Sequence, residues 1–298
     1  MDISKLGEFG LIERIKKLIT TDASVVKGPG DDCAVIRFNR THYQLLTTDM
    51  LVEGVDFTLK DNPGLVGRKA LAVSLSDIAA CGGIARYALI DIGLPLKTKW
   101  RFVQELLKGM TSLACEFKVD IVGGDISRAE KVILVSSVVG LVEKKNLVFR
   151  SGAKEGDAIV VSGSLGGSIR GRHLQFIPRL RQSRYLVENY KINAMIDISD
   201  GLAQDLGHIL KASRVGAVIY KELIPLAKQA KDINEALFMG EDFELLFTLS
   251  FKEALRLIKD KPYEFMVIGE IVSKGFGLRL VDRYKKRTKI KPLGYRHF

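Results

Sequence analysis

The chain has 298 residues, enough for two domains or one large α/β unit. Its 47% hydrophobic content excludes a disordered chain, and the apolar run at 132–142 is too short and too interrupted to span a bilayer. A net charge of +11 fits nucleic-acid or membrane binding, or solubility combined with attraction for small anions.

The first half of the chain alternates predicted helices and strands. Helices are expected where apolar residues recur with helical spacing, at 8–19, 64–81 and 99–117. Strands are expected at 33–38, 43–48, 87–94, 120–123 and 131–142.

The second half restarts the pattern after a polar, charged stretch at 143–156. A turn at 163–168 is expected to lead into a helix, and a further helix is expected at 202–214. Strands are expected at 158–162, 194–198, 217–220, 243–249, 264–271 and 278–281. This alternation predicts an α/β or α+β protein with an N-terminal domain at 1–145 and a C-terminal domain at 146–298.

Short carboxylate-bearing segments recur beside glycines and apolar runs in this basic chain. They are Gly30-Asp31-Asp32, Thr47-Thr48-Asp49, Leu75-Ser76-Asp77, Gly123-Gly124-Asp125, Asp197-Ile198-Ser199-Asp200 and Gly240-Glu241-Asp242. Each half has strand ends that deliver carboxylates, which are typical ligands of hard cations. Several brought together would bind Mg²⁺, and Mg²⁺ usually accompanies phosphate chemistry.

Each segment also has an ordinary structural interpretation. Asp31 and Asp32 sit in a turn, and only one of two neighbouring side chains can face a given site. Asp77 interrupts an apolar helix, either as an exposed residue or as a ligand. Asp200 or Ser199 could cap the helix that follows, although one polar group suffices for a cap.

Other motif searches exclude several classes of site. The sequence has no phosphate-binding P-loop, no protein-kinase catalytic loop and no dinucleotide fingerprint. Cys33, Cys81 and Cys115 show no metal-ligand spacing, and the N-terminus has no apolar signal segment. We therefore expect reduced thiols in a cytoplasmic protein.

Taken in order, the segments resemble the thiamine-monophosphate kinase family, part of a superfamily that includes aminoimidazole ribonucleotide synthetase. The resemblance runs from end to end. It is carried by Gly7-Glu8-Phe9-Gly10, by the carboxylate segments, by Arg150-Ser151-Gly152-Ala153, by Gly240-Glu241-Asp242-Phe243-Glu244-Leu245 and by Gly294-Tyr295-Arg296-His297-Phe298.

The resemblance implies a two-domain aminoimidazole ribonucleotide synthetase-like fold, α/β (α+β), whose N-terminal sheet pairs across a homodimer. It implies direct in-line transfer of a phosphoryl group from ATP to thiamine monophosphate, with ATP as co-substrate and several Mg²⁺ ions as cofactors. The acceptor is a phosphate that is already ionised, so the reaction needs charge screening more than a strong base.

The resemblance also implies roles for individual residues. Metal ligands would be Asp32, Thr47, Thr48, Asp49, Asp77, Asp125, Asp197 and Asp200, with Asp31 a weaker candidate. Asp49, Asp125 and Asp200 would be catalytic, and Gly124, Asp125, Arg150 and Ser199 would bind the nucleotide. Asp56, Glu241 and Tyr295 would bind the substrate, the tyrosine ring suiting a cationic thiazolium.

The chain departs from the family pattern in three places. Asp56 stands where the family commonly has His, Ile126-Ser127 replaces a Thr-Thr pair, and the stretch 166–193 is short and rich in Arg. Two alternatives stay open: a related ATP-using enzyme with another phosphate or amide substrate, and a non-catalytic basic nucleotide- or RNA-binding protein. The scatter of the basic residues argues against nucleic acid as a partner.

Overall fold

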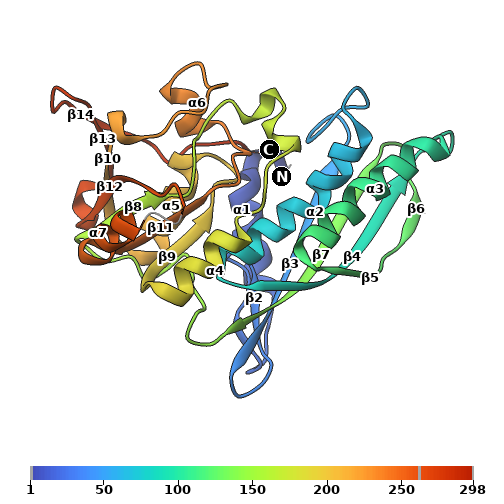
Figure 1. Cartoon of the computed structure of the whole chain (residues 1–298), viewed down its shortest axis with the longest axis horizontal. Helices are drawn as coiled ribbons and strands as arrows, with labels where there is room; N and C mark the ends of the chain where they lie inside the picture. The colour runs from blue at the N-terminus through green and yellow to red at the C-terminus, as the bar shows by residue number, and fades with distance from the viewer. Residues whose placement is uncertain (1–2, 261–262, 297–298) are drawn as a thin grey trace.

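The computed structural model describes residues 3–260 and 263–296, and each half of the chain forms a seven-stranded sheet (Figure 1). His297 and Phe298, which carry part of the family resemblance, lie outside the described residues. The two sheets with their helices bear out the predicted α/β (α+β) class.

The N-terminal half builds its sheet in the order β1-β2-β3-β7-β4-β5, with β6 also paired to β4. Strands β3 and β7 form a long antiparallel pair, from His42 opposite Glu143 to Val52 opposite Ile133. The elements are α1 (Ile3–Leu18), β1 (Val25–Lys27), β2 (Ala34–Arg37), β3 (His42–Val52), α2 (Pro63–Ala80), β4 (Ile84–Leu94), α3 (Trp100–Phe117), β5 (Asp120–Gly123), β6 (Ile126–Arg128) and β7 (Ile133–Glu143).

The C-terminal half builds its sheet in the order β14-β13-β10-β12-β8-β11-β9. Its strands are β8 (Asp157–Val161), β9 (Ile192–Asp197), β10 (Gly216–Tyr220), β11 (Leu245–Ser250), β12 (Met266–Val272), β13 (Leu278–Val281) and β14 (Arg287–Lys289). Its helices are α4 (Leu180–Asn189), α5 (Leu202–Ser213), α6 (Ile233–Phe238) and α7 (Phe251–Asp260), with short 3-10 turns η1 (Ser168–Arg170), η2 (Arg172–Leu174), η3 (Lys221–Leu223) and η4 (Lys274–Phe276).

Strand β8 separates two hydrophobic cores. Ala158 and Val160 face a core that continues through α2 into the N-terminal half, whereas Ile159 and Val161 face a second core under α5 and α6. This alternation follows from the two-residue period of a strand. One apolar core therefore joins the halves, with α2 between them.

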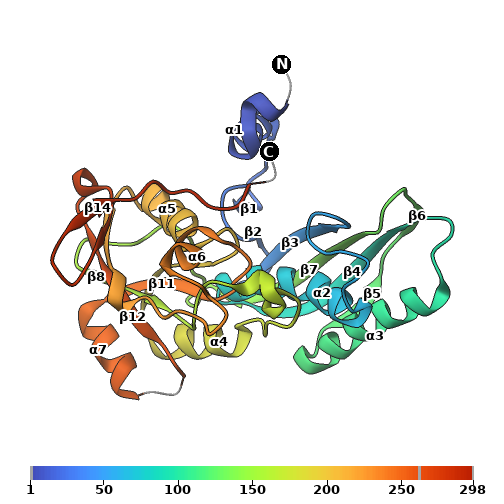
Figure 2. The same ribbon diagram turned by 90° about the horizontal axis from the view of Figure 1, so that it is seen from above.

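Helices α2 and α3 cover one face of the N-terminal sheet, and no helix among the described residues covers the opposite face of β4, β5 and β6 (Figure 2). That open face carries large, partly exposed apolar side chains, including Tyr87, Leu89 and Val122. An apolar surface of this kind is typical of a protein–protein interface.

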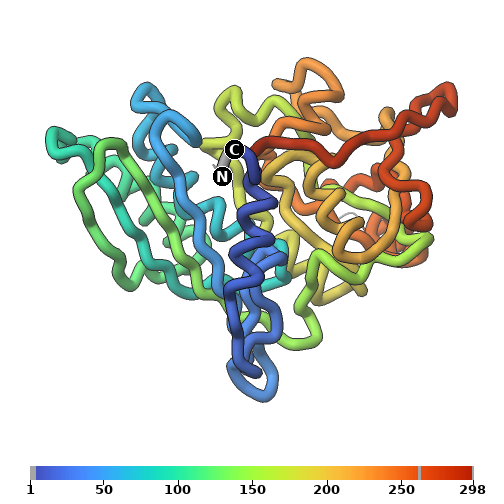
Figure 3. The backbone as a smooth tube through the Cα atoms, turned by 180° about the vertical axis from the view of Figure 1, so that it is seen from behind, coloured from blue at the N-terminus to red at the C-terminus, as the bar shows by residue number. Residues whose placement is uncertain are grey.

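Helix α1 lies at the junction of the halves, and the C-terminal segment ends beside it (Figure 3). The Arg296 guanidinium lies 5.6 Å from the centroid of the Phe9 ring, a cation–π contact between the two ends of the described chain. None of the helices in the described ranges is long and apolar enough to cross a membrane.

The sequence-based expectations fail at two places. The predicted strand 43–48 extends to Val52, so Asp49 lies inside β3 and not at its end. The glycine-rich turn at 163–168 leads into the 3-10 turns η1 and η2 and not into a regular helix, because Gly166, Gly167 and Gly171 adopt positive φ. The predicted domain boundary at 145/146 falls between β7 and β8.

The crossing of α2 and α3 requires glycine. A Cβ on Gly109 would lie 1.8 Å from the carbonyl oxygen of Gly64. We predict that Gly109→Ala lowers the free energy of unfolding by about 2 kcal/mol, despite the better helix propensity of Ala. Thermal unfolding measures the change, with Gly275→Ala as control because an added Cβ there meets no atom within 4 Å. Equal stability of the two variants would contradict the packing argument.

Candidate active site

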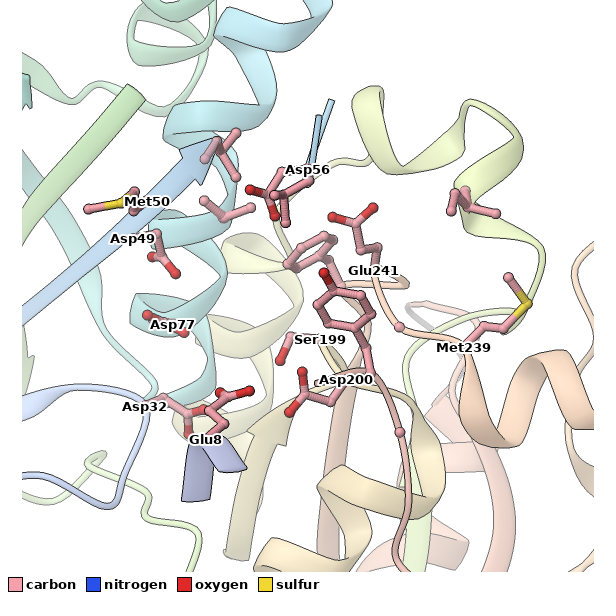
Figure 4. A pocket seen from close by; sticks show the side chains of 18 of the residues that line it. Glu8, Asp32, Asp49, Met50, Asp56, Asp77, Ser199, Asp200, Met239 and Glu241 are labelled. Atoms are coloured by element: carbon pink, nitrogen blue, oxygen red, sulfur yellow. The ribbon is translucent and has the colours of Figure 1, made fainter. Parts of the chain in front are cut away.

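A cavity of about 500 Å³ lies between the two halves (Figure 4). One wall comes from β3 and α2 of the N-terminal half. The facing wall comes from residues 199–200, 238–241 and 294–295, with Glu8 of α1 also reaching it. Most of the residues singled out in the sequence line this cavity or adjoin it.

Three aspartates from separate elements meet at one end of the cavity. Asp32 precedes β2, Asp77 lies in α2 and Asp197 ends β9, yet one carboxylate oxygen from each lies within 4.8 Å of the others. Oδ2 of Asp32 is buried and has no hydrogen-bond partner among the described residues. An all-oxygen donor set with an unsatisfied buried carboxylate fits a hard divalent cation.

Asp49 and Thr47 extend this group because alternate residues of a strand share a face. The Asp49 carboxylate accepts a hydrogen bond of 2.7 Å from Ser74 Oγ of α2, and the Thr47 hydroxyl donates to Asp77. Thr48 faces the other side of the sheet, where its hydroxyl lies 2.9 Å from Ser137 Oγ. The prediction that the Thr48 side chain joins the same ligand set is not supported by this geometry.

Helix α2 supplies polar partners that the sequence analysis missed. Ser76 Oγ donates to Asp197 Oδ2 over 2.6 Å, and Ser74 Oγ also lies 2.6 Å from Ser136 Oγ. Lys69 is fully buried on the same helix. The available signal was the presence of these polar residues in an otherwise apolar helix, where unpartnered groups would be costly.

Burial and nearby carboxylates raise the pKa values of Asp49, Asp77 and Asp197. Burial and the neighbouring Asp32 raise the pKa of Asp197 to about 7. Burial, with Asp49 and Asp197 close by, raises the pKa of Asp77 well above its ordinary value. Burial likewise raises the pKa of Asp49. Like charges held this close favour either protonation or a bound cation.

Arg150 is the cation that faces this group. Its Nη2 donates to Asp32 Oδ1 over 2.8 Å, and its buried Nε has no hydrogen-bond partner among the described residues. Burial alone would lower the pKa of Arg150, but the adjacent carboxylates outweigh it and raise that pKa. The backbone N–H of Arg150 donates to Asp31 Oδ1 over 3.0 Å, so Asp31 anchors this segment instead of facing the cavity.

Ser199 and Asp200 face the cavity from the C-terminal half (Figure 4). Neither caps α5, whose N-cap residue is Gly201. Asp205 in the first turn of α5 accepts the backbone N–H groups of Asp200 and Gly201, each over 3.0 Å. The simpler interpretation of Ser199 and Asp200 as helix caps is therefore wrong.

Asp56 and Glu241 lie at the end of the cavity away from Asp32 (Figure 4), and Tyr295 also lines the cavity. Asp56 Oδ2 accepts the backbone N–H of Val52 over 2.7 Å, which closes the turn after β3. Glu241 has a φ of 66°, and its carboxylate forms an ion pair with Lys69. This end of the cavity is rich in carboxylates and suits a cationic group.

Gly124 and Asp125 do not join the cluster. Neither lines the cavity, and both are exposed beside β5 and β6 on the open face of the sheet. A Cβ on Gly124 would lie 1.7 Å from the carbonyl oxygen of Ile90, so this glycine is required for packing against β4. The Asp125 backbone N–H donates to Asp91 Oδ1 over 2.8 Å.

Comparisons with known proteins agree with this arrangement of two domains. The sequence family described as AIR synthase related protein, N-terminal domain, matches residues 30–142, and the corresponding C-terminal domain matches residues 154–281. The thiamine-monophosphate kinase of Aquifex aeolicus is 36% identical to this chain, and the match covers 100% of both proteins. That of Buchnera aphidicola subsp. Schizaphis graminum is 35% identical, covering 98% of this chain and 99% of that protein.

The solved structures give the same result. AaThiL complexed with AMPPCP and TMP superposes with a TM-score of 0.88 at 33% identity, covering 100% of this chain and 99% of that one. The thiamine monophosphate kinase from Aquifex aeolicus superposes with a TM-score of 0.80 at 30% identity, covering 97% and 100% of the two chains.

The raised pKa values predict how stability depends on pH. Between the ordinary Asp value of 3.8 and about 7, Asp197 binds its proton more tightly in the folded protein than in the unfolded chain. The stability of EDTA-treated protein should therefore fall as pH rises through this window. We expect Mg²⁺ to remove most of that fall, and Asp77→Asn to reduce it without Mg²⁺. Thermal unfolding at pH 5 and pH 8 measures both effects, and a Tm that rises with pH in EDTA would contradict the prediction.

Proposed function

Because this chain belongs to the thiamine-monophosphate kinase family of AIR synthase related proteins, we propose that it phosphorylates thiamine monophosphate with ATP. The bond between the γ-phosphorus of ATP and its bridging oxygen breaks, and a phosphate oxygen of thiamine monophosphate bonds to that phosphorus. The products are ADP and thiamine diphosphate. The observation that carries the proposal is the convergence of Asp32, Asp77 and Asp197, two of which line the cavity.

The composition of the cavity suits a phosphate acceptor. A phosphate oxygen is ionised near neutral pH, so transfer to it needs alignment and charge screening more than proton removal. Among the described residues that line the cavity there is no histidine to act as a general base. Full-length similarity to thiamine-monophosphate kinases, one of them complexed with AMPPCP and TMP, supports the choice of substrates.

We assign the Mg²⁺ sites to Asp32, Asp49, Asp77, Asp197 and Asp200, with Thr47 beside them. When bound, Mg²⁺ would neutralise phosphate charge and hold the two polyanions together. Asp49 and Asp200, proposed as catalytic, stand on facing walls of the cavity. Ser74 and Ser76 fix Asp49 and Asp197 by hydrogen bonds, which keeps the carboxylates oriented.

Nucleotide phosphates are proposed to bind near Arg150 and Ser199. Arg150 combines a permanent charge with an Nε–H that is directed to no protein acceptor among the described residues. At the other end, the carboxylates of Asp56 and Glu241 and the Tyr295 ring would receive the cationic thiazolium. This polarity orients thiamine monophosphate with its phosphate toward the aspartates.

A homodimer is proposed from the open apolar face of the N-terminal sheet. Gly124 and Asp125 lie on this face, and we propose that they act on the nucleotide at the subunit interface. A cytoplasmic location is proposed because Cys33, Cys81 and Cys115 are free thiols.

The Arg-rich segment 166–193 gives little support to the alternative hypothesis of a basic RNA-binding protein. Its arginines are engaged within the protein and do not form a free basic surface. The ion pairs are Arg170–Glu235, Arg172–Asp242, Arg179–Glu244 and Arg184–Glu143, and Arg181 lies 6.0 Å from the centroid of the Phe117 ring. The other alternative, a related enzyme that acts on another substrate, is tested by measuring ADP release with a panel of substrates.

We predict that the purified protein forms thiamine diphosphate from ATP, Mg²⁺ and thiamine monophosphate. Asp49→Asn should lower kcat by about a thousandfold, because loss of one metal-binding carboxylate removes several kcal/mol of charge stabilisation. Asp61→Asn is the matched control, since its carboxylate only bonds to Thr58 in a surface turn. Product formation by chromatography measures both. Wild-type activity in Asp49→Asn would refute the metal assignment, and an inactive wild type would refute the function.

We predict that light scattering gives twice the 33.0 kDa mass of the chain. Leu89→Lys combined with Tyr87→Lys should yield monomers, because two charges on the open face would be buried without partners. Leu255→Lys, on the exposed side of α7, is the control and should leave the mass unchanged. A wild-type monomer at working concentration would remove the dimer from the proposal.

A further inference from the structure

Lys69 is a lysine with no exposed side-chain surface, placed between the two halves of the protein. Its Nζ donates to the backbone carbonyl of Asp56 over 2.9 Å and forms an ion pair with the Glu241 carboxylate. Asp56 belongs to the N-terminal half, and Glu241 belongs to the C-terminal half, 172 residues after Lys69. A buried ammonium is costly unless it is paired, so this position is not an accident of packing.

The segment held by Lys69 has a constrained backbone. Glu241 and Phe243 adopt φ values of 66° and 49°, where residues other than glycine are uncommon. Their N–H groups donate over 2.7 Å to the carbonyls of Ser199 and Ile198. These bonds fix the main chain against the cavity wall but leave the direction of the Glu241 side chain to its ion pair with Lys69.

The other contact of Lys69 is with the turn that follows β3. This turn is closed by the bond from Val52 N–H to Asp56 Oδ2 and by the 2.7 Å bond from Gly54 N–H to the Phe57 carbonyl. Lys69 thus ties both carboxylate-bearing segments at one end of the cavity to α2. The aspartate cluster at the other end has its own supports, Ser74 and Ser76.

We propose that Lys69 is a positioning residue for substrate specificity, which aims Glu241 at the cationic end of thiamine monophosphate and holds that end of the cavity closed. The inference rests on the proposed function. It separates two tasks along α2: Lys69 sets the binding of the acceptor, and the residues from 74 to 77 set the phosphoryl-transfer site. Loss of Lys69 should therefore weaken acceptor binding and spare the transfer step.

The test compares Lys69→Met, which keeps the length of the side chain without its charge, with Arg68→Met. Arg68 is the neighbouring residue of α2 and pairs with Glu116 on the helix surface, away from the cavity. We expect Lys69→Met to raise KM for thiamine monophosphate about tenfold, the effect of losing one charged hydrogen bond, with kcat and KM for ATP within about twofold of wild type. Arg68→Met should leave all three unchanged.

A second variant shows whether Lys69 acts through Glu241. Glu241→Gln should raise the same KM, and Lys69→Met added to it should raise KM little further, since the two residues act as one unit. Additive effects, an unchanged KM in Lys69→Met, or equal losses in kcat and both KM values would overturn the proposal. Lys69→Gln, which keeps a donor for the Asp56 carbonyl, replaces Lys69→Met if the latter does not fold.

A measurement without substrate separates this inference from the proposed function. Amide hydrogen exchange at Glu241 and Phe243 should speed up in Lys69→Met and not in Arg68→Met, because the ion pair no longer holds the segment. If wild-type protein makes no thiamine diphosphate, the proposed function fails, and unchanged exchange would then reject the link made by Lys69 as well.

Discussion

The structure depends on one constraint: the polar side chains of α2 are buried between two sheets and must find partners on both sides. Ser74 bonds to Asp49 in β3, Ser76 to Asp197 at the end of β9, and Lys69 to Glu241 before β11. Because buried polar groups are costly when unpartnered, these bonds fix how the C-terminal half sits against the N-terminal half. The cavity is therefore a product of the same contacts that join the halves.

The buried carboxylates of the site repel one another, and the rest of the fold must offset this unfavourable energy. The pKa values of Asp77 and Asp197 are raised because burial and the neighbouring carboxylates both disfavour the charged forms. Arg150 relieves part of this repulsion, and the continuous apolar core through α2 supplies the stability that the site lacks. Like charges held this close favour either protonation or a bound cation, which is the basis for proposing Mg²⁺ here.

Local patterns identified several segments that line the cavity, but not which side chains face it or which residues pair across long distances in the chain. Asp77 was a candidate because a carboxylate in an apolar helix needs a partner, and the structure provides Thr47. The Thr48 side chain points away from the aspartates, because neighbouring residues of a strand face opposite sides of the sheet and Thr47 and Asp49 face the cluster. Lys69 was not found because lysines in amphipathic helices are mostly exposed, and its partner lies 172 residues away.

Asp56 is one of the three places at which this sequence departs from the pattern of its family, and its contacts show what this departure changes. The link to Lys69 uses the backbone carbonyl of Asp56, which any residue would provide. The carboxylate bonds instead to the Val52 N–H and adds negative charge near Tyr295, whose pKa is raised by burial and by the nearby Asp56 and Glu241. The substitution therefore preserves the link made by Lys69 and makes this end of the cavity more anionic, which favours a positively charged group there.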